Sequence, residues 1–229
     1  MQYRRVLAIG DMHGNFNRLL NLIHKVDFDP ERDFLILLGD YIDRGDENMR
    51  CLRWAMEMSE KKNVIALRGN HEQMMYYYYM LGGTEGSIWL PNGGSLTKRE
   101  LDAWLKREPD ALQRCLDFIR LRPMYHQMFI EGQEYIFVHA GLRNGIPLNK
   151  QTEEALLWSR GEFYRNYTGS AKVICGHTPT PYFNVERADQ YYPLKLDNNI
   201  TIIDTGSFLP QGRISCIDVI SNTIWQSNN

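Results

Sequence analysis

Gly69-Asn70-His71-Glu72 is the stretch that decides the fold, and it follows the apolar run Val64-Ile65-Ala66-Leu67 after one intervening residue, Arg68. A short β-branched run closed by a glycine is typical of a buried strand that ends in a tight turn. The turn places an amide side chain, which can bind a metal, next to an imidazole, which can donate a proton. On its own, such a turn is weak support for a functional site.

Four further apolar runs end in the same way, with polar, glycine-flanked residues directly after a predicted strand. They are Val6–Ile9 before Gly10-Asp11-Met12-His13-Gly14, Phe34–Leu38 before Gly39-Asp40, Tyr135–Val138 before His139-Ala140-Gly141, and Val173–Cys175 before Gly176-His177. Ligands of open α/β sheets lie just beyond the carboxyl ends of the strands. We therefore expect the five strand ends to meet at one crevice.

The order of the expected elements predicts an α/β fold. Strands and helices alternate up to residue 67, which is the mark of βαβ units on a mainly parallel sheet. Residues 74–123 are expected to form a helical insertion beside the crevice, with Thr97-x-x-Glu100 as a capping box that opens one helix. From residue 124 onward, runs of short strands predict a second, mixed sheet stacked on the first. No linker or repeat interrupts residues 1–229, so we expect a single domain.

The composition, 43% hydrophobic and 24% charged, is that of an ordinary soluble globular protein. A formal net charge of −2 argues against a broad nucleic-acid-binding surface. No apolar run has the length of a signal peptide or of the roughly 18–20 residues that span a bilayer. The four cysteines have no CxxC spacing and are expected to be reduced, mostly buried thiols: Cys51, Cys115, Cys175 and Cys216. We expect a cytoplasmic monomer that binds neither nucleic acid nor a membrane.

The polar residues at the strand ends have the chemistry of a two-metal site. Asp11 and His13 can point at one ion, and Asp40 can bridge it to a second ion. The expected metal ligands share imidazole, carboxylate or amide donors: Asp11, His13, Asp40, Asn70, His139 and His177. Mixed donors of this kind suit Mn²⁺, Fe or Zn²⁺ better than Mg²⁺ or Ca²⁺. Only two of these six ligands are anionic, so two divalent ions leave a positive site that favours a phosphate dianion. The pattern indicates a two-metal phosphoesterase.

Each segment taken alone is more often structural, since glycine-aspartate turns are common and buried histidines usually serve the core. Five such segments in one chain, all at predicted strand ends, make the functional interpretation the better one.

In this order, the blocks resemble the signature blocks of the PPP-type metallophosphatases, which are calcineurin-like phosphoesterases. The blocks that carry the resemblance are Gly10-Asp11-Met12-His13-Gly14, Gly39-Asp40-Tyr41-Ile42-Asp43-Arg44-Gly45, Gly69-Asn70-His71-Glu72, His139-Ala140-Gly141 and Gly176-His177. Arg68 to Met75, Asn92-Gly93-Gly94 and Gly176-His177-Thr178-Pro179 look most like the bacterial and bacteriophage branch, typified by the phage lambda protein phosphatase. The resemblance implies a four-layer α/β/β/α sandwich of two mixed sheets and two divalent ions, with Mn²⁺ favoured.

The resemblance also implies roles for individual residues. His71 would be the general acid, and Asp43 would orient its imidazole. Arg44, Arg68 and Arg160 would bind the phosphoryl oxygens, a task that suits the guanidinium fork. An ion pair on a loop is the alternative for Asp43-Arg44, and a surface arginine is the alternative for Arg160.

Two further features leave alternatives open. Asp204 is either a partner of a metal-bound histidine or a turn carboxylate. The run Tyr76-Tyr77-Tyr78-Tyr79 is either a stacking platform for a substrate or a packed helix, and packing is the more common use of such residues.

The residues together with the resemblance imply phosphoester hydrolysis by a metal-bound hydroxide with a histidine general acid, without a phosphoenzyme. Serine/threonine phosphoproteins are the expected substrates, and a small phosphoester is the alternative. A diadenosine tetraphosphate hydrolase shares the same blocks and is the rival enzyme. A catalytically silent phosphate-binding protein is the alternative from another class.

Overall fold

The computed structural model describes residues 3–183, 186 and 189–228. Its first sheet has the strand order β10-β9-β1-β2-β3. The three N-terminal strands run parallel, and helices α1 and α2 connect them: β1 (Arg5–Ile9), α1 (Phe16–Val26), β2 (Asp33–Leu37), α2 (Asn48–Ser59) and β3 (Val64–Ala66). The alternation of strand and helix therefore builds βαβ units, as the sequence predicts.

The last two strands, β9 (Ser215–Asp218) and β10 (Ile224–Gln226), complete this first sheet. β9 pairs antiparallel with β1, and β10 pairs antiparallel with β9. The expectation that all strands after residue 124 belong to the second sheet is therefore wrong. Hydrophobic alternation shows that a segment is a strand, but it does not say which neighbour the strand will pair with.

The second sheet has the strand order β4-β5-β6-β8-β7 and mixes parallel and antiparallel pairs. Its strands are β4 (Tyr125–Ile130), β5 (Gln133–Val138), β6 (Lys172–Cys175), β7 (Leu194–Lys195) and β8 (Ile200–Ile202). β7 has only two residues, too few to show a period, and the sequence reading missed it.

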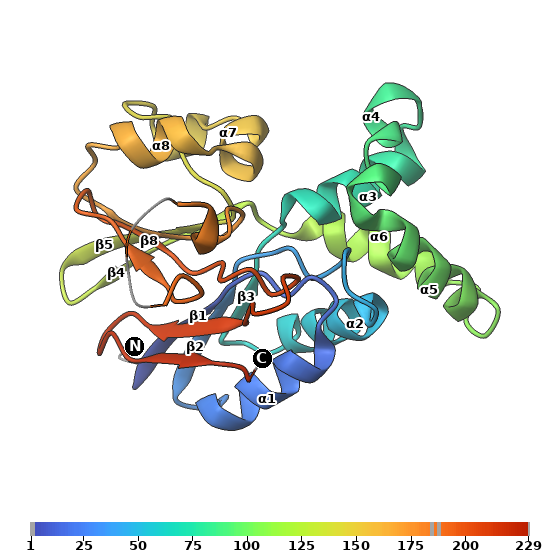
Figure 1. The fold of residues 1–229 in the computed structure, drawn as a ribbon, viewed down its shortest axis with the longest axis horizontal. Helices are drawn as coiled ribbons and strands as arrows, with labels where there is room; N and C mark the ends of the chain where they lie inside the picture. Colours follow the sequence, from blue (N-terminus) through green and yellow to red (C-terminus); the bar gives the residue numbers. More distant parts are fainter. Residues whose placement is uncertain (1–2, 184–185, 187–188, 229) are drawn as a thin grey trace.

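Side chains alternate across the strands, and this alternation builds the layers. Val6 and Ala8 of β1 pack against Phe137 of β5 and Ile174 of β6 in the core between the two sheets. Another core lies outside the first sheet, against α1 and α2. A third covers the second sheet, beneath α7 (Glu153–Trp158) and α8 (Gly161–Asn166). Helix, sheet, sheet and helix make the predicted four-layer α/β/β/α sandwich (Figure 1).

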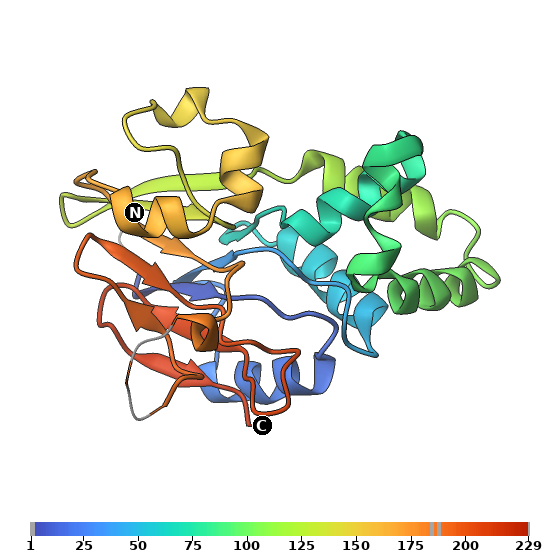
Figure 2. The ribbon, with the colours of Figure 1, turned by 45° about the horizontal axis from the view of Figure 1, so that its top comes forward.

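Residues 70–121 form a group of helices on one side of the sandwich (Figures 1 and 2). The group contains α3 (Asn70–Met80), α4 (Gly83–Ser87), the short helix η1 (Leu90–Gly94), α5 (Ser95–Leu105) and α6 (Ala111–Leu121). Its buried residues, Trp89 and Leu101 among them, belong to the same core as the outer face of the first sheet. The single domain with a helical insertion stays a prediction.

The expected capping box at Thr97 is wrong, because α5 begins at Ser95 and Thr97 lies inside the helix. The four cysteines are buried free thiols, as expected. Two further short helices are η2 (Leu148–Lys150) and η3 (Thr180–Tyr182). Within the described part of the chain, none of the helices has the length and apolar character needed to cross a membrane.

Candidate active site

The turns after β1 and β2 are tied to each other at the carboxyl ends of these strands. The backbone N–H groups of Met12 and His13 both donate to the carbonyl of Asp40, at 3.0 and 2.9 Å. The side chain of Asn15 donates to the carbonyls of Met12 and His13 and so braces the first turn. The neighbouring turns therefore hold Asp11, His13 and Asp40 in one place.

Glu72 holds the second turn from the side of α3. Its carboxylate accepts backbone N–H groups from Asp40 and Tyr41, both at 2.8 Å, from Gly69 at 3.0 Å and from Ile42 at 3.3 Å. The sequence reading gave Glu72 no role. A glutamate three residues after a glycine at the end of a strand is the signal that could have identified it, because this is the spacing of a helix N-terminal cap.

Two glycines are required by the close approach of the carboxylates. A Cβ atom at Gly69 would lie 2.2 Å from Oδ1 of Asp40, and one at Gly176 would lie 2.0 Å from Oδ1 of Asp11. Only glycine leaves room for these carboxylates. The glycines before Asn70 and His177 thus serve the site directly, in addition to forming tight turns.

Five residues of the site have backbone conformations with positive φ, which non-glycine residues rarely adopt. They are His13 (44°), Asp40 (52°), Asp43 (74°), Arg44 (73°) and His177 (66°). Strain of this kind is kept only where surrounding contacts enforce it, and it gathers at functional sites.

Asp40 is the centre of two groups of side chains that could each hold a metal ion. His13 and His71 form one group with it, and His139 and His177 form the other; within each group the donor atoms lie within 4.8 Å of one another. Oδ2 of Asp40 is 3.6 Å from Nε2 of His13, and Oδ1 is 3.4 Å from Nε2 of His139. All five side chains are buried.

Asn70 and Asp11 complete the set of predicted ligands. Oδ1 of Asn70 lies 2.9 Å from Nε2 of His139 and 2.9 Å from Nδ1 of His177. Asp11 is 2% exposed and accepts the backbone N–H of His177 at 3.0 Å. The structure therefore brings together all six residues that the sequence reading selected as ligands, from the ends of five strands.

The histidines of this cluster are held in the form that a metal binds. Nδ1 of His13 lies 3.1 Å from the carbonyl of Ile42, and Nδ1 of His139 lies 2.9 Å from the carbonyl of Leu38. A carbonyl only accepts, so Nδ1 of each ring carries a proton, and Nε2 of His13 turns its lone pair to the cluster. Burial lowers the pKa of His13, His139 and His177, which favours the neutral imidazole.

The carboxylates show that the cluster suits cations. Burial, followed by the charges of Asp204 and Asp40, raises the pKa of Asp11 well above its ordinary value. Divalent ions would relieve this repulsion and offset the desolvation of the carboxylates. The donor set, its burial and its excess of confined negative charge fit a pair of divalent cations.

His71 and Asp43 form a buried pair beside the cluster. Nδ1 of His71 is 2.7 Å from Oδ2 of Asp43, and Nε2 is 3.9 Å from Oδ2 of Asp40. Asp43 is 0% exposed and, in the described part of the chain, its ion-pair contact is with His71 and not with Arg44, so the alternative of a local Asp43–Arg44 ion pair does not describe it. The same carboxylate also contacts Trp89 and Thr97, which the sequence reading missed.

The three predicted phosphate-binding arginines have different positions. Nη1 of Arg44 donates to Nε2 of His13 at 2.8 Å, and its guanidinium lies 4.2 Å from the ring centroid of Phe208. Arg160 is exposed, and its Nη1 donates to Oγ1 of Thr178, next to His177. Phe208 is another residue that the sequence reading missed.

Arg68 points elsewhere. Its Nε and Nη2 donate to backbone carbonyls at the end of α6, and its Nη1 donates to Gln73. All three guanidinium nitrogens are thus engaged away from the cluster of candidate metal ligands. The phosphate-binding role of Arg68 stays a prediction that these contacts do not favour.

The two features with open alternatives now have contacts. Among the described residues, Asp204 has no hydrogen bond to a histidine; its Oδ1 accepts the N–H of Gly206, which is the contact of a turn carboxylate. Tyr78 and Tyr79 pack against Trp89, with ring centroids 5.1 and 5.8 Å away. These contacts match the alternative of a packed helix, which is the more common use of a run of tyrosines.

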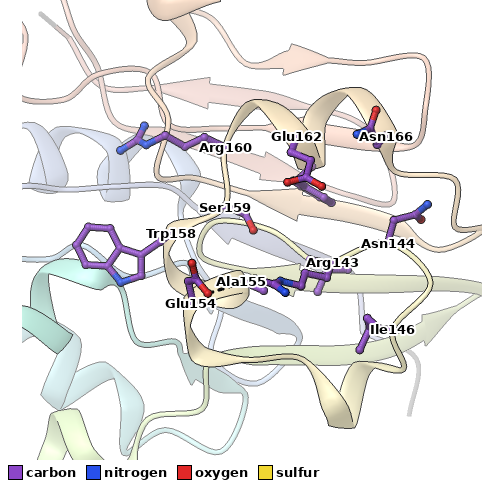
Figure 3. A pocket seen from close by; sticks show the side chains of 12 residues that line it. Arg143, Asn144, Ile146, Glu154, Ala155, Trp158, Ser159, Arg160, Glu162 and Asn166 are labelled. Atoms are coloured by element: carbon purple, nitrogen blue, oxygen red, sulfur yellow. Dashed lines mark hydrogen bonds and ion pairs between the residues drawn. The ribbon is translucent and has the colours of Figure 1, made fainter.

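A hollow of about 570 Å³ lies beside the cluster, between the loop that follows β5 and helices α7 and α8. Figure 3 shows Trp158 and Arg160 extending from one edge of this hollow, whereas Asn144 and Asn166 lie at the other edge. The ring centroid of Trp158 is 6.1 Å from that of His177. The edge that carries Trp158 therefore borders the cluster of candidate metal ligands.

Comparison with known proteins agrees with this geometry. Residues 4–206 match the family model of the calcineurin-like phosphoesterases. The chain belongs to that family. The sequence of this calcineurin-like phosphoesterase is 31% identical to serine/threonine-protein phosphatase 2 of Salmonella typhimurium over 212 residues, which cover 90% of this chain and 89% of the relative.

The phosphoesterase also resembles proteins with other substrates in their names. It is 32% identical to the symmetrical bis(5'-nucleosyl)-tetraphosphatase of Methylobacillus flagellatus, over 70% of this chain and 52% of that protein. A cold-active protein-tyrosine phosphatase of a psychrophilic Shewanella superposes with a TM-score of 0.64 at 17% identity, over 99% of this chain and 81% of that structure. The last comparison supports the fold alone.

Proposed function

We propose that this phosphoesterase is a serine/threonine protein phosphatase that depends on two divalent ions. The observation that carries the proposal is the convergence of six donor side chains from five strand ends around Asp40. The similarity to a serine/threonine phosphatase over 90% of the chain supports the substrate class. A cytoplasmic location and a monomeric state remain predictions.

One ion would be held by Asp11, His13 and Asp40, and the other by Asp40 together with Asn70, His139 and His177. When bound, the pair would supply Lewis acidity at the phosphate and an activated water as nucleophile. We propose Mn²⁺ as the favoured metal, with Fe or Zn²⁺ as alternatives, because the donors mix imidazole with oxygen.

His71 would protonate the leaving alkoxide as the phosphorus–oxygen bond of the ester breaks. The contact of its Nδ1 with Asp43 leaves Nε2 free to carry the proton that is donated. Asp43 would stabilise the imidazolium that precedes the transfer and fix the orientation of the ring. Both residues are buried, so bulk water does not replace either contact.

Arg44 and Arg160 would bind the phosphoryl oxygens. The Arg44 guanidinium already lies against His13, and Arg160 reaches the cluster from the α7–α8 side. Two guanidinium groups that approach from different sides can stabilise negative charge as it develops on the phosphoryl group. Arg68 would instead hold the end of α6 in place.

A dinucleoside tetraphosphate hydrolase is the second candidate. The observation that favours it is the 32% identity to such an enzyme, although the chain spans only 52% of that protein's length. A silent binding protein is the third candidate, and nothing in the His71–Asp43 pair favours it, because a binding protein has no need of an oriented proton donor.

The experiment is hydrolysis of a phosphoserine peptide and of diadenosine tetraphosphate, with Mn²⁺ and after chelation. Metal-dependent preference for the peptide is the expected result. Preference for the dinucleotide would change the proposed substrate class but leave the proposed active site unchanged. A His71→Ala variant that keeps full turnover would refute the proposed general acid.

A further inference from the structure

The turn that carries Asp43 and Arg44 needs an external support. Both residues have positive φ, at 74° and 73°, so the turn has a conformation that side chains disfavour. Its support comes from the segment between Trp89 and Thr97, at the junction of η1 and α5. We call this segment, residues 89–97, the dyad clamp, after the dyad of His71 and Asp43.

Thr97 and Trp89 contact both oxygens of Asp43. The Thr97 hydroxyl donates to Oδ1 at 2.5 Å and accepts the backbone N–H of Asp43 at 3.1 Å. The Trp89 indole N–H donates to Oδ2 at 2.9 Å, and the same oxygen lies 2.7 Å from Nδ1 of His71. Both oxygens of the Asp43 carboxylate are therefore held by Trp89 and Thr97, and this fixes the position from which the carboxylate orients the His71 imidazole.

Trp89 itself is held from two sides. It is fully buried and packs against Tyr78 and Tyr79 of α3. A Cβ atom at Gly94 would lie 2.6 Å from the indole nitrogen, so the backbone passes directly over the ring. The indole N–H has little freedom to leave Asp43.

The dyad clamp also contacts Arg44. The carbonyl of Gly93 accepts the backbone N–H of Arg44 at 3.4 Å, and a Cβ atom at Gly93 would lie 3.0 Å from Cγ of Arg44. One segment of the helical group therefore contacts both the partner of the proposed acid and a proposed phosphate ligand.

We propose that Trp89 and Thr97 are positioning residues for the His71–Asp43 pair, and that the helical group serves proton donation through them. This inference rests on the proposed function, in which His71 is the general acid. A positioned acid matters most when the leaving group is a strong base, such as the alkoxide of serine. It matters least for an activated aryl phosphate, whose leaving group departs without a proton.

The test compares two substrates in Mn²⁺: a phosphoserine peptide and 2,4-dinitrophenyl phosphate. Thr97→Val keeps the shape of the side chain and removes the hydroxyl, whereas Thr97→Ser keeps the hydroxyl. Trp89→Phe removes the indole N–H, and Trp104→Phe is its matched control, because Trp104 lies in α5 without a contact to Asp43 among the described residues.

We expect Thr97→Val and Trp89→Phe to lower kcat for the peptide by about 10-fold or more, within the ~10²–10⁴-fold that general acid–base catalysis supplies. Both should keep kcat for dinitrophenyl phosphate, and Thr97→Ser and Trp104→Phe should keep both rates. Equal losses on both substrates, or no loss on the peptide, would overturn the inference. A wild-type protein that hydrolyses neither substrate would instead refute the proposed function.

A second measurement needs no turnover. In the metal-free protein, the proton between His71 and Asp43 should give a downfield NMR resonance, because a short hydrogen bond to a buried carboxylate deshields it. We expect Thr97→Val and Trp89→Phe to shift or broaden this resonance, and Thr97→Ser and Trp104→Phe to retain it. An unchanged resonance in the first two variants would contradict the positioning role.

Discussion

Replacing Glu72 by glutamine tests how the turn that carries Asp40 is held. Each carboxylate oxygen accepts two backbone N–H groups, from Gly69 and Asp40 on one oxygen and from Tyr41 and Ile42 on the other. Glutamine turns one of these acceptors into a donor, so two buried N–H groups lose their partner whichever way the amide lies. A buried donor without a partner costs about 1–3 kcal/mol. The free energy of unfolding should therefore fall by about 2–6 kcal/mol.

The assay is scanning calorimetry of the metal-free protein. It is run at about pH 5, below the pKa of about 8 to which burial and the charge on Asp40 raise Glu72, because ionisation of the buried carboxylate at higher pH itself lowers the stability of the wild type and would mask the loss. For a chain of this size the change corresponds to a fall in Tm of at least about 4 °C. Glu57→Gln, on the exposed face of α2, is the matched control and should leave Tm unchanged. A Glu72→Gln protein that melts within about 1 °C of the wild type would refute the reasoning.

Three further predictions concern other parts of the chain. Burial opposes ionisation of Asp33, but hydrogen bonds from Arg5 and Arg4 lower its pKa well below the ordinary value, so its stabilisation is present above about pH 4 and lost below it. Asp33→Asn should cost about 2 kcal/mol in urea unfolding at neutral pH, and an undiminished difference in acid would contradict the assignment. Gly176→Ala pushes a Cβ atom into the Asp11 carboxylate and should weaken Mn²⁺ binding about 10-fold or more by calorimetry; unchanged affinity would show that the carboxylate is not needed there. Asn144→Trp narrows the hollow beside Arg160 and should raise KM for a phosphoserine peptide while leaving KM for phenyl phosphate unchanged. If the variant and the wild type have the same KM for the peptide, the hollow does not take part in substrate binding.

The strand ends were predictable because each signal is local. A β-branched run followed by glycine and a polar residue gives a strand, a turn and a candidate donor within a few residues. The rule that such ends face one edge of a parallel sheet then predicts that Asp40, Asn70 and His139 meet. The order of these blocks along the chain is also enough to recognise the resemblance to the family.

The contacts that support the site were not predictable from the sequence, because they join distant segments. Thr97 has the spacing of a helix cap with Glu100, yet its hydroxyl bonds Asp43, 54 positions away. Glu100 instead accepts the N–H groups at the start of α2, from Asn48 and Met49. Arg68 stands beside Gly69 in sequence, but its side chain turns to α6. The spacing of Thr97 and Glu100 is compatible with capping of the same helix, but it does not say which groups the two side chains will bind. Tertiary packing decides which partner each side chain contacts.

Metal stoichiometry tests the central claim most directly, because both candidate groups of ligands share Asp40. The measurement is native mass spectrometry of the metal-free protein titrated with Mn²⁺, beside the Asp40→Asn variant and a Glu57→Gln control. The account predicts two ions for each wild-type and control chain, and loss of the two-ion species in Asp40→Asn. A wild-type chain that binds a single ion, or an Asp40→Asn chain that still binds both with unchanged affinity, would contradict a dinuclear centre built around Asp40.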